Sequence, residues 1–213
     1  MNSEEKEITY KTSNSYSTLN THTSQTKTVW FVCHGMGYLS RYFLRYFKDL
    51  NPEENYIIAP QAPSKYYIQP KMHVGANWLT RDETKSGMEN IMSYFDSVFE
   101  AEQIQNDVNL IILGYSQGVS VAMRYMAKRQ LQCNQLVLHS GGIPKELKAN
   151  DFDYLSKETK VKLIYGTADE YLDEARIKLE SKRAKELFGN RVTILPFEGK
   201  HVVNVDYINR LVK

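Results

Sequence analysis

A serine between two glycines is the residue in this sequence best placed to do covalent chemistry. The segment Gly-Tyr-Ser-Gln-Gly at residues 114–118 follows an apolar run at 109–113 and opens a helical pattern at 119–129. A strand that turns this tightly into a helix needs flanking residues without bulk, and it presents the serine hydroxyl at the strand end. The strain on such a serine, about 1–3 kcal/mol, usually persists only where it serves chemistry. The pattern therefore predicts that Ser116 is a nucleophile.

A serine hydroxyl needs a general base, and the base needs a carboxylate to fix its tautomer. In hydrolases built on this strand-turn-helix, the three groups follow one another in the order serine, acid, histidine. His139 and His201 are the two histidines after Ser116, and the sequence between Ser116 and His139 contains no Asp or Glu. The order therefore predicts that His201 is the base.

The acid must lie between this serine and this histidine. Asp169 follows an apolar run in a Gly-x-x-Asp turn, which would place it at the end of a buried strand. Asp151, Asp153 and Asp173 lie in polar or helical stretches instead. We therefore predict Asp169 as the acid, with Glu170 as the alternative, because sequence does not decide which of two adjacent carboxylates faces an imidazole.

A second glycine-rich loop, His-Gly-Met-Gly at residues 34–37, follows the apolar run 28–33. Glycines in such a loop let backbone N–H groups point at a developing negative charge, as an oxyanion hole requires. We predict the N–H groups of Met36 and Gln117 as the two donors and expect His34 to be structural. The alternative is a plain strand-to-helix turn.

These residues need a scaffold, and the sequence alternates between strand and helix patterns. Apolar runs lie at 28–33, 56–59, 109–113, 135–138, 161–165 and 192–195, and helical patterns lie at 40–50, 81–103, 119–129, 172–188 and 203–212. This alternation predicts one α/β domain over residues 1–213, with a mostly parallel sheet covered by helices on both faces. Ligands bind at the carboxyl ends of such strands, where Ser116, Asp169 and His201 fall.

Two segments do not follow the alternation. The polar N-terminal segment 1–27 is predicted to form a hairpin at the sheet edge, with strands at 8–10 and 16–19 and with His22 exposed. Residues 64–78 form the longest aperiodic stretch and are predicted to be an irregular binding loop. The predicted substrate pocket combines residues of this stretch with residues of the other loops: Tyr38, Tyr66, Tyr67, Met72, Trp78, Ile143, Tyr171 and Leu172. For each of these side chains, the alternative is that it covers the core and does not line a pocket.

Composition narrows the function classes. The chain has 42% hydrophobic and 24% charged residues and a net charge of +2, which does not favour a nucleic-acid partner. No apolar run approaches the length of a membrane span, and the N-terminus does not match a signal peptide. Cys33 and Cys133 show no ligand-like spacing, so we expect two buried thiols, no metal and no cofactor. A cytoplasmic monomer or homodimer acting on a small molecule is expected.

The motifs resemble those of the α/β-hydrolase superfamily, and more narrowly of its phospholipase/carboxylesterase group, which includes acyl-protein thioesterases. Residues 114–118 look like the group's Gly-Phe-Ser-Gln-Gly, residues 34–37 like the end of its Leu-His-Gly-x-Gly, and residues 138–144 are similar to its Leu-Ser-Gly-x-Leu-Pro. The resemblance spans residues 28–212 and implies an α/β-hydrolase fold and a serine esterase or thioesterase with an acyl-serine intermediate. Cys33, Tyr38 and Val119 depart from the group's usual residues, which weakens the expectation of a lipidated protein substrate.

The chain is also compact, since no insertion large enough for a cap domain separates Val137 from Asp169. An uncapped site is expected to be open and shallow, which favours esters or thioesters of short to medium acyl chains. The rival interpretation from another class is a non-catalytic protein of the same fold that binds a small ligand in the same pocket.

Overall fold

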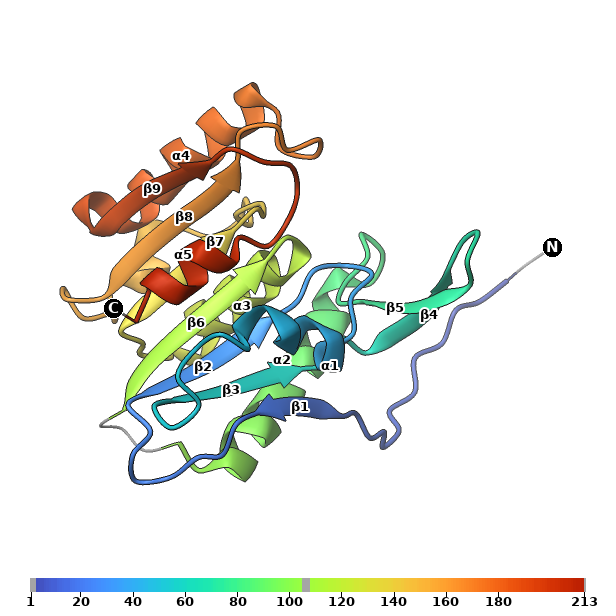
Figure 1. Cartoon of the computed structure of the whole chain (residues 1–213). Coiled ribbons are helices and arrows are strands. Elements are labelled where there is room, and N and C mark those ends of the chain that lie inside the picture. Colours follow the sequence, from blue (N-terminus) through green and yellow to red (C-terminus); the bar gives the residue numbers. More distant parts are fainter. Residues whose placement is uncertain (1–2, 105–107, 213) are drawn as a thin grey trace.

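The computed structural model describes residues 3–104 and 108–212 and is built around a seven-stranded sheet of order β1-β3-β2-β6-β7-β8-β9 (Figure 1). These strands are β1 (Tyr16–Leu19), β2 (Thr28–Cys33), β3 (Asn55–Pro60), β6 (Asn109–Tyr115), β7 (Gln135–His139), β8 (Lys160–Gly166) and β9 (Val192–Phe197). Only β1 runs antiparallel to its neighbour; all other pairs are parallel. The predicted α/β fold with a mostly parallel sheet is confirmed.

Helices cover both faces of the sheet (Figure 1). One face carries α2 (Thr84–Glu102), α3 (Gln117–Arg129) and α4 (Glu174–Phe188), and the other carries α1 (Ser40–Phe43), the 3-10 helix η1 (Leu44–Phe47) and α5 (Val205–Arg210). Two further 3-10 helices are η2 (Ala149–Phe152) and η3 (Gly189–Arg191). None of the helices in these described ranges is long and apolar enough to cross a membrane.

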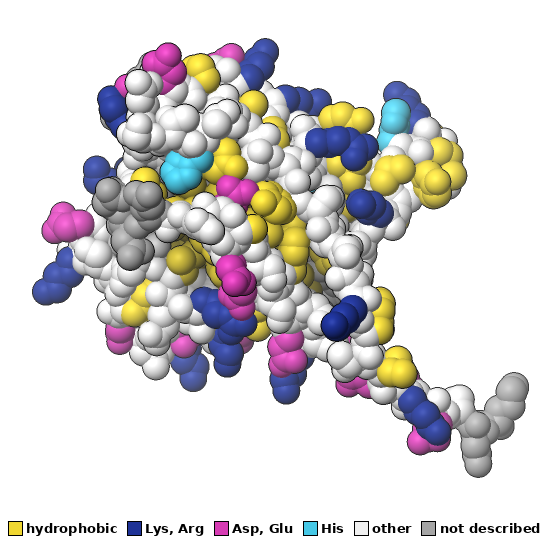
Figure 2. Space-filling view, turned by 90° about the horizontal axis from the view of Figure 1, so that it is seen from below, with side chains coloured by type: hydrophobic (Ala, Val, Ile, Leu, Met, Phe, Trp, Pro, Cys, Tyr) yellow, Lys and Arg dark blue, Asp and Glu magenta, His cyan; other side chains and the backbone are white. Residues whose placement is uncertain are grey.

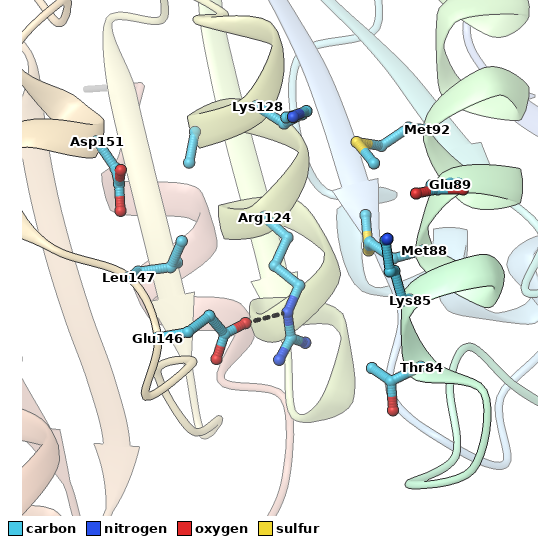
Figure 3. A pocket seen from close by; sticks show the side chains of 11 residues that line it. Thr84, Lys85, Met88, Glu89, Met92, Arg124, Lys128, Glu146, Leu147 and Asp151 are labelled. Atoms are coloured by element: carbon cyan, nitrogen blue, oxygen red, sulfur yellow. Dashed lines mark hydrogen bonds and ion pairs between the residues drawn. The ribbon is translucent and has the colours of Figure 1, made fainter.

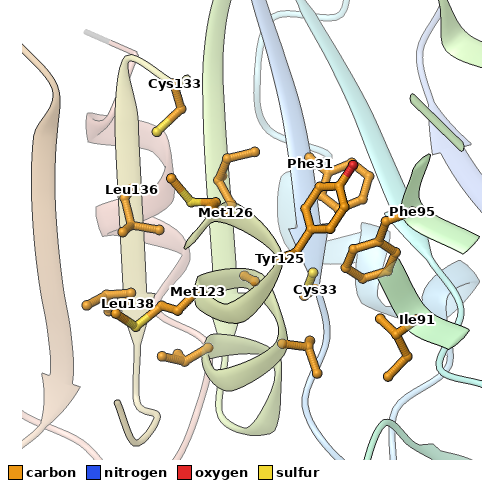
Figure 4. Close-up of a cluster of buried hydrophobic side chains, with 14 of the residues drawn as sticks. Phe31, Cys33, Ile91, Phe95, Met123, Tyr125, Met126, Cys133, Leu136 and Leu138 are labelled. Atoms are coloured by element: carbon orange, nitrogen blue, oxygen red, sulfur yellow. The ribbon is translucent and has the colours of Figure 1, made fainter. Parts of the chain in front are cut away.

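Strand β2 shows why the strands of this sheet appear in the sequence as continuous apolar runs. Its residues are all buried, and alternate side chains enter opposite cores: Phe31 and Cys33 face one side, and Trp30 and Val32 face the other. Side chains of a strand alternate between faces, so a sheet covered on both sides needs apolar residues at every position. In the core beneath α2 and α3, Phe31 packs against Phe95 with ring centroids 5.0 Å apart (Figure 4).

The stretch 64–78 is not an irregular loop, as the sequence suggested, but a two-stranded hairpin of β4 (Ser64–Ile68) and β5 (His73–Asn77). The hairpin projects from the body of the molecule (Figure 1), and β4 is largely exposed. A strand without a buried face has no alternation of apolar and polar residues to reveal it. This is why the sequence pattern missed it.

The predicted N-terminal hairpin is also wrong. Strand β1 exists and pairs with β3, but residues 8–10 form no strand, and Ile8 and Tyr10 are exposed. A polar strand that buries neither face gains little from pairing. His22 is half-buried rather than exposed and stacks on Tyr56, with ring centroids 5.4 Å apart. Residues 1 and 2 of the predicted segment lie outside the described residues.

Several helix bounds also differ from prediction. The helix expected at 40–50 is the short α1 followed by η1, and α5 covers 205–210 instead of 203–212. Helix α4 begins at Glu174, not at residue 172, because Asp173 caps it by accepting from the Arg176 N–H at 2.8 Å. Helix α2 begins at Thr84 instead of residue 81.

Candidate active site

Ser116 lies in a strained turn between β6 and α3. Its φ of 53° and ψ of −120° place a non-glycine residue where side chains are rarely tolerated. The flanking glycines are required by close backbone contacts, since a Cβ on Gly118 would lie 2.0 Å from the Cys33 carbonyl oxygen and one on Gly114 would lie 2.4 Å from Val119 Cα. The turn therefore fixes the serine at the carboxyl end of a central strand.

The three residues predicted from chain order meet at this strand end. His201 Nε2 lies 3.0 Å from Ser116 Oγ, and His201 Nδ1 lies 2.7 Å from Asp169 Oδ2. A carboxylate can only accept, so the Nδ1 proton is assigned to this contact and Nε2 is left to accept the serine proton. The imidazole is 13% exposed, whereas the carboxylate is completely buried. A nucleophile, a base and an orienting acid are thus connected by two hydrogen bonds.

The carboxylate of Asp169 is held on its other side as well. Its Oδ1 accepts from the backbone N–H groups of Tyr171 and Leu172 at 2.8 and 3.1 Å. The neighbouring Glu170 does not face the imidazole: its exposed carboxylate accepts from the His201 backbone N–H at 3.2 Å. Hydrogen bonds from the backbone N–H groups of Glu170 itself and of His201 lower the pKa of the Glu170 carboxyl. Of the two adjacent carboxylates, Asp169 occupies the position that orients a base.

Two polar side chains from the strand ends hold the loop that carries His201. The Tyr115 hydroxyl donates to the His201 carbonyl oxygen at 3.0 Å. His139 Nε2 accepts from the Asn204 N–H at 2.9 Å, and its Nδ1 lies 3.1 Å from Ser140 Oγ. Burial lowers the pKa of His139 to about 3, so this ring stays neutral and keeps its acceptor. The sequence excluded His139 as a base, but it did not predict that Tyr115 and His139 hold the His201 loop. The signal that could have found them is a polar side chain at the end of an apolar strand.

The glycine-rich loop after β2 passes directly beside the serine. A Cβ on Gly35 would lie 3.0 Å from Tyr115 Cδ1 and 3.1 Å from Ser116 Cβ, so a larger residue there would crowd the serine. The preceding His34 is buried, with Nδ1 2.8 Å from the Gly35 carbonyl oxygen and Nε2 accepting from the Ala62 N–H at 3.2 Å. Burial lowers its pKa to about 4. His34 thus holds the loop and is not placed to exchange protons with a substrate.

The predicted oxyanion donors each follow one of the two residues that meet here, since Met36 follows Gly35 and Gln117 follows Ser116. Gln117 is the first residue of α3, where backbone N–H groups have no partner within the helix and the helix dipole favours negative charge. Its side chain is engaged elsewhere, accepting from the Trp78 N–H at 2.9 Å and donating to Asn77 Oδ1 at 2.6 Å. Within the described residues, neither the Gln117 nor the Met36 N–H donates a hydrogen bond. Both amides are therefore available to a ligand.

The predicted pocket residues divide into two groups. Tyr171 is 72% exposed, and its ring meets the His201 ring edge-on with centroids 4.9 Å apart, so it stands at the mouth of the site. The prediction that Trp78 and Ile143 line the pocket is wrong, because they are only 2% and 3% exposed and belong to the core. The Trp78 indole N–H donates to the His34 carbonyl oxygen at 2.7 Å, and this hydrogen bond supports the glycine-rich loop 34–37. Leu172 is also buried.

The predicted pocket tyrosines lie around the glycine-rich loop. Tyr38 is partly buried, with its ring 5.8 Å from that of Tyr115 and its hydroxyl 3.3 Å from the Tyr46 hydroxyl. Tyr66 and Tyr67 are adjacent on β4 and so point to opposite faces of the hairpin. Met72, between β4 and β5, is exposed. Only part of the predicted pocket is therefore assembled near Ser116.

Three hollows in the surface do not include Ser116 in their lining. One, of about 530 Å³, lies between α2, α3 and the segment 146–151 and is bordered by an ion pair of Arg124 and Glu146 at 2.6 Å (Figure 3). Another, of about 490 Å³, adjoins the glycine-rich loop at Gly37. In residues 3–104 and 108–212, no group of three or more His, Cys, Asp and Glu side chains is arranged to bind a metal ion.

Comparisons with known proteins give a family and a fold. A family described as phospholipase/carboxylesterase matches residues 14–212. Among solved structures, the chain is similar to an acyl-protein thioesterase 2 from Zea mays, with 17% identity and a TM-score of 0.70 over 94% of this chain and 98% of that one. A phospholipase/carboxylesterase from Dyadobacter fermentans has 17% identity and a TM-score of 0.68 over 96% and 98% of the two chains. A Bacillus cereus carboxylesterase has 15% identity and a TM-score of 0.66 over 93% and 91%.

A comparison with curated proteins finds no match. At identities below one in five, the structural similarities show the fold, which is that of the α/β-hydrolases without a large cap.

Proposed function

We propose that this chain, which belongs to the phospholipase/carboxylesterase family of α/β-hydrolases, is a serine hydrolase that cleaves carboxylic esters or thioesters of short to medium acyl chains. The observation that carries the proposal is the hydrogen-bonded series Ser116, His201 and Asp169, with contacts of 3.0 and 2.7 Å. The partner is a small-molecule ester or thioester. Two free, buried thiols fit the cytoplasmic location that we propose.

In the proposed reaction, Ser116 Oγ attacks the carbonyl carbon of the ester while its proton passes to His201 Nε2. Buried Asp169 stabilises the imidazolium that forms and keeps its ring in place. The N–H groups of Met36 and Gln117 donate hydrogen bonds to the carbonyl oxygen and stabilise its negative charge. His201 then protonates the departing alcohol or thiol, which leaves an acyl-Ser116 ester.

The second half of the reaction repeats the first with water. His201 takes a proton from a water molecule, the resulting hydroxide attacks the acyl-serine carbonyl, and the proton returns to Ser116 Oγ as the carboxylic acid leaves. The backbone bonds from Tyr171 and Leu172 to Asp169 hold the carboxylate through both halves. In residues 3–104 and 108–212, no segment between the strands of the sheet forms a large cap, which supports short to medium acyl chains.

A Ser116→Ala variant tests this proposal. We expect hydrolysis of p-nitrophenyl butyrate to fall by about 10⁴- to 10⁶-fold, because the nucleophile is lost while binding and the oxyanion donors remain. Circular dichroism checks that the variant is folded. Ser97→Ala is the matched control, since Ser97 is exposed on α2 and its hydroxyl donates to the Ser93 carbonyl oxygen within the same helix. Wild-type turnover by folded Ser116→Ala protein would rule out Ser116 as the nucleophile. Folded wild-type protein without turnover would favour the rival interpretation, a non-catalytic ligand-binding protein.

A further inference from the structure

We propose that the hollow between the glycine-rich loop and the β4–β5 hairpin binds a carboxylate on the substrate, so that the preferred esters have an acyl chain ending in a negative charge. The hollow has a volume of about 490 Å³, which suits part of a small molecule. Its lining comes from the glycine-rich loop, from the short helices that follow it and from the hairpin, and includes Gly37, Arg41, Tyr42 and Arg45. This inference rests on the proposed esterase function and adds the class of substrate.

The hollow is fixed next to the proposed reaction centre. Gly37, on its wall, lies two residues after Gly35, the residue whose backbone passes beside Ser116. The hairpin is fastened to the same loop, because the Gly37 N–H donates to the Ala76 carbonyl oxygen at 2.8 Å. A Cβ on Gly75 would lie 2.7 Å from the Gly37 carbonyl oxygen, so the contact needs a glycine. Two residues of extended chain span at most about 7 Å, so a six-carbon acyl chain attached at Ser116 is long enough to reach the wall of the hollow.

The charge of the lining is one-sided. Arg41 and Arg45 contribute positive charge to it, and no Asp or Glu lies in the lining. Within residues 3–104 and 108–212, neither arginine forms an ion pair with a carboxylate. The hollow between α2 and α3 differs, because its basic residues are interspersed with acidic ones such as Glu146, which pairs with Arg124. An anion is thus attracted to the hollow beside the glycine-rich loop and not to the hollow between α2 and α3.

Both guanidinium groups are oriented by aromatic rings. Arg41 Cζ lies 4.8 Å from the Tyr42 ring centroid, and Arg45 Cζ lies 4.8 Å from that of Tyr46. Arg45 also donates to the Tyr46 hydroxyl at 2.7 Å. Stacking uses the faces of the guanidinium groups and leaves N–H groups on their edges, which match the geometry of a carboxylate. In the space-filling view, Lys and Arg side chains lie beside hydrophobic ones where the β4–β5 hairpin meets the body of the molecule (Figure 2).

The test compares two substrates of equal chain length. One is p-nitrophenyl hexanoate, and the other is the mono-p-nitrophenyl ester of adipic acid, which ends in a carboxylate instead of a methyl group. We expect kcat/KM for the adipate ester to exceed that for the hexanoate by about threefold to tenfold after subtraction of uncatalysed hydrolysis, mainly through a lower KM. The ratio should fall as sodium chloride is added, because salt screens exposed charges.

Arg41→Gln and Arg45→Gln should each bring the ratio closer to one. Lys157→Gln is the matched control: it removes one positive charge from an exposed position outside the lining and should leave the ratio unchanged. A ratio at or below one in the wild type, with hexanoate still hydrolysed, would overturn the inference and leave the proposed function intact. A high ratio that both arginine variants retain would also overturn it. Failure to hydrolyse either ester would overturn the proposed function, and this inference with it.

Discussion

Three of the five histidines lie in or beside the proposed site, and their surroundings assign them different tasks. His34 and His139 are fully buried, and both ring nitrogens of each are in contact with neighbouring polar atoms. His201 alone joins a serine hydroxyl to a carboxylate. Chain order was sufficient to prefer His201 over His139, but the structural task of His139 depends on a contact with Asn204, 65 residues away, which no local pattern encodes.

Exchanging each of the two adjacent carboxylates tests which one orients the base. Asp169→Asn should lower kcat by about 10⁴-fold, as in another serine hydrolase, because an amide N–H facing Nδ1 favours the wrong tautomer. Glu170→Gln should change kcat little, since its carboxylate accepts from backbone N–H groups and not from the imidazole. Steady-state kinetics on p-nitrophenyl butyrate measures both. A large loss in the Glu170 variant with a small one in the Asp169 variant would assign the acid to Glu170.

The buried neutral histidines predict how stability depends on pH. Burial lowers the pKa of His139 from 6.5 to about 3 and that of His34 from 6.5 to about 4. Between about pH 4 and 6.5 the unfolded chain therefore binds two protons that the folded chain does not. Acidification should lower the free energy of unfolding by up to about 1.4 kcal/mol per pH unit for each histidine. Urea unfolding at pH 5 and pH 6 measures this slope.

Substituting one of these histidines isolates its share of the slope. His139→Gln keeps an acceptor for the Asn204 N–H but cannot bind a proton, so it should reduce the slope by up to about 1.4 kcal/mol per pH unit. His73→Gln, at an exposed position on β5, is the control and should leave the slope unchanged. An equal slope in the wild type and the His139 variant would contradict the assignment of His139 as a neutral buried group.

At the scale of elements, strand β6 and the loop after β9 are joined by one side chain. The Tyr115 hydroxyl donates to the His201 carbonyl oxygen, and its ring packs 5.3 Å from the imidazole. The Gly-Phe-Ser-Gln-Gly pattern that this segment resembles has phenylalanine at that position. The hydroxyl is thus a positioning group for the loop, and its removal leaves the packing of the ring intact.

Tyr115→Phe should lower kcat by about twofold to tenfold with little change in KM, because one hydrogen bond that holds the His201 loop is lost. Tyr154→Phe is a close control, since the Tyr154 hydroxyl also donates to a backbone carbonyl, that of Met126 at 2.7 Å. It should lower stability by a similar amount and leave kcat unchanged. Equal kcat in the wild type and the Tyr115 variant would remove the positioning role.

Two helix glycines should respond in opposite ways to substitution by alanine. Gly118 in α3 has no room for a Cβ, which would lie 2.0 Å from the Cys33 carbonyl oxygen, so Gly118→Ala should destabilise the fold by at least about 3 kcal/mol. At Gly87 in α2, a Cβ would lie 3.1 Å from the flexible end of Leu79, and Gly87→Ala should gain up to about 1 kcal/mol. Thermal and urea unfolding measure both. Comparable stability of the two variants would contradict the close approach at Gly118.

The sequence predicted those elements whose buried apolar residues form a continuous run or follow a helical period. The strands at 28–33 and 109–115 and the helix α2 were recognised because their patterns reflect contact with the core. The β4–β5 hairpin was missed because it buries little, and the N-terminal strand at 8–10 was expected from polar β-branched and aromatic residues that find no partner. Trp78 was placed in a binding surface since aromatic residues occur in both settings, and only the packing shows that it is buried.

At the scale of the whole molecule, the proposed site exists only when most of the sheet is assembled. Ser116 follows β6, Asp169 follows β8 and His201 follows β9, while the glycine-rich loop follows β2. Parallel strands bring these four loops to one edge, although their residues are far apart in the chain. This arrangement explains why motif spacing and chain order sufficed to predict which residues meet at this edge. The shape of the proposed substrate-binding surface depends on the hairpin and on long-range packing, and it could not be derived from the sequence.

Covalent labelling with a fluorophosphonate is the most direct test that Ser116 is an activated nucleophile. The folded protein should gain one phosphonyl group, located on Ser116 by peptide mass spectrometry, because His201 activates this hydroxyl and the oxyanion donors stabilise the attack. Labelling should be absent in Ser116→Ala and strongly slowed in His201→Gln. Folded wild-type protein that remains unlabelled, or that is labelled on another residue, would contradict the assignment of Ser116 as the nucleophile.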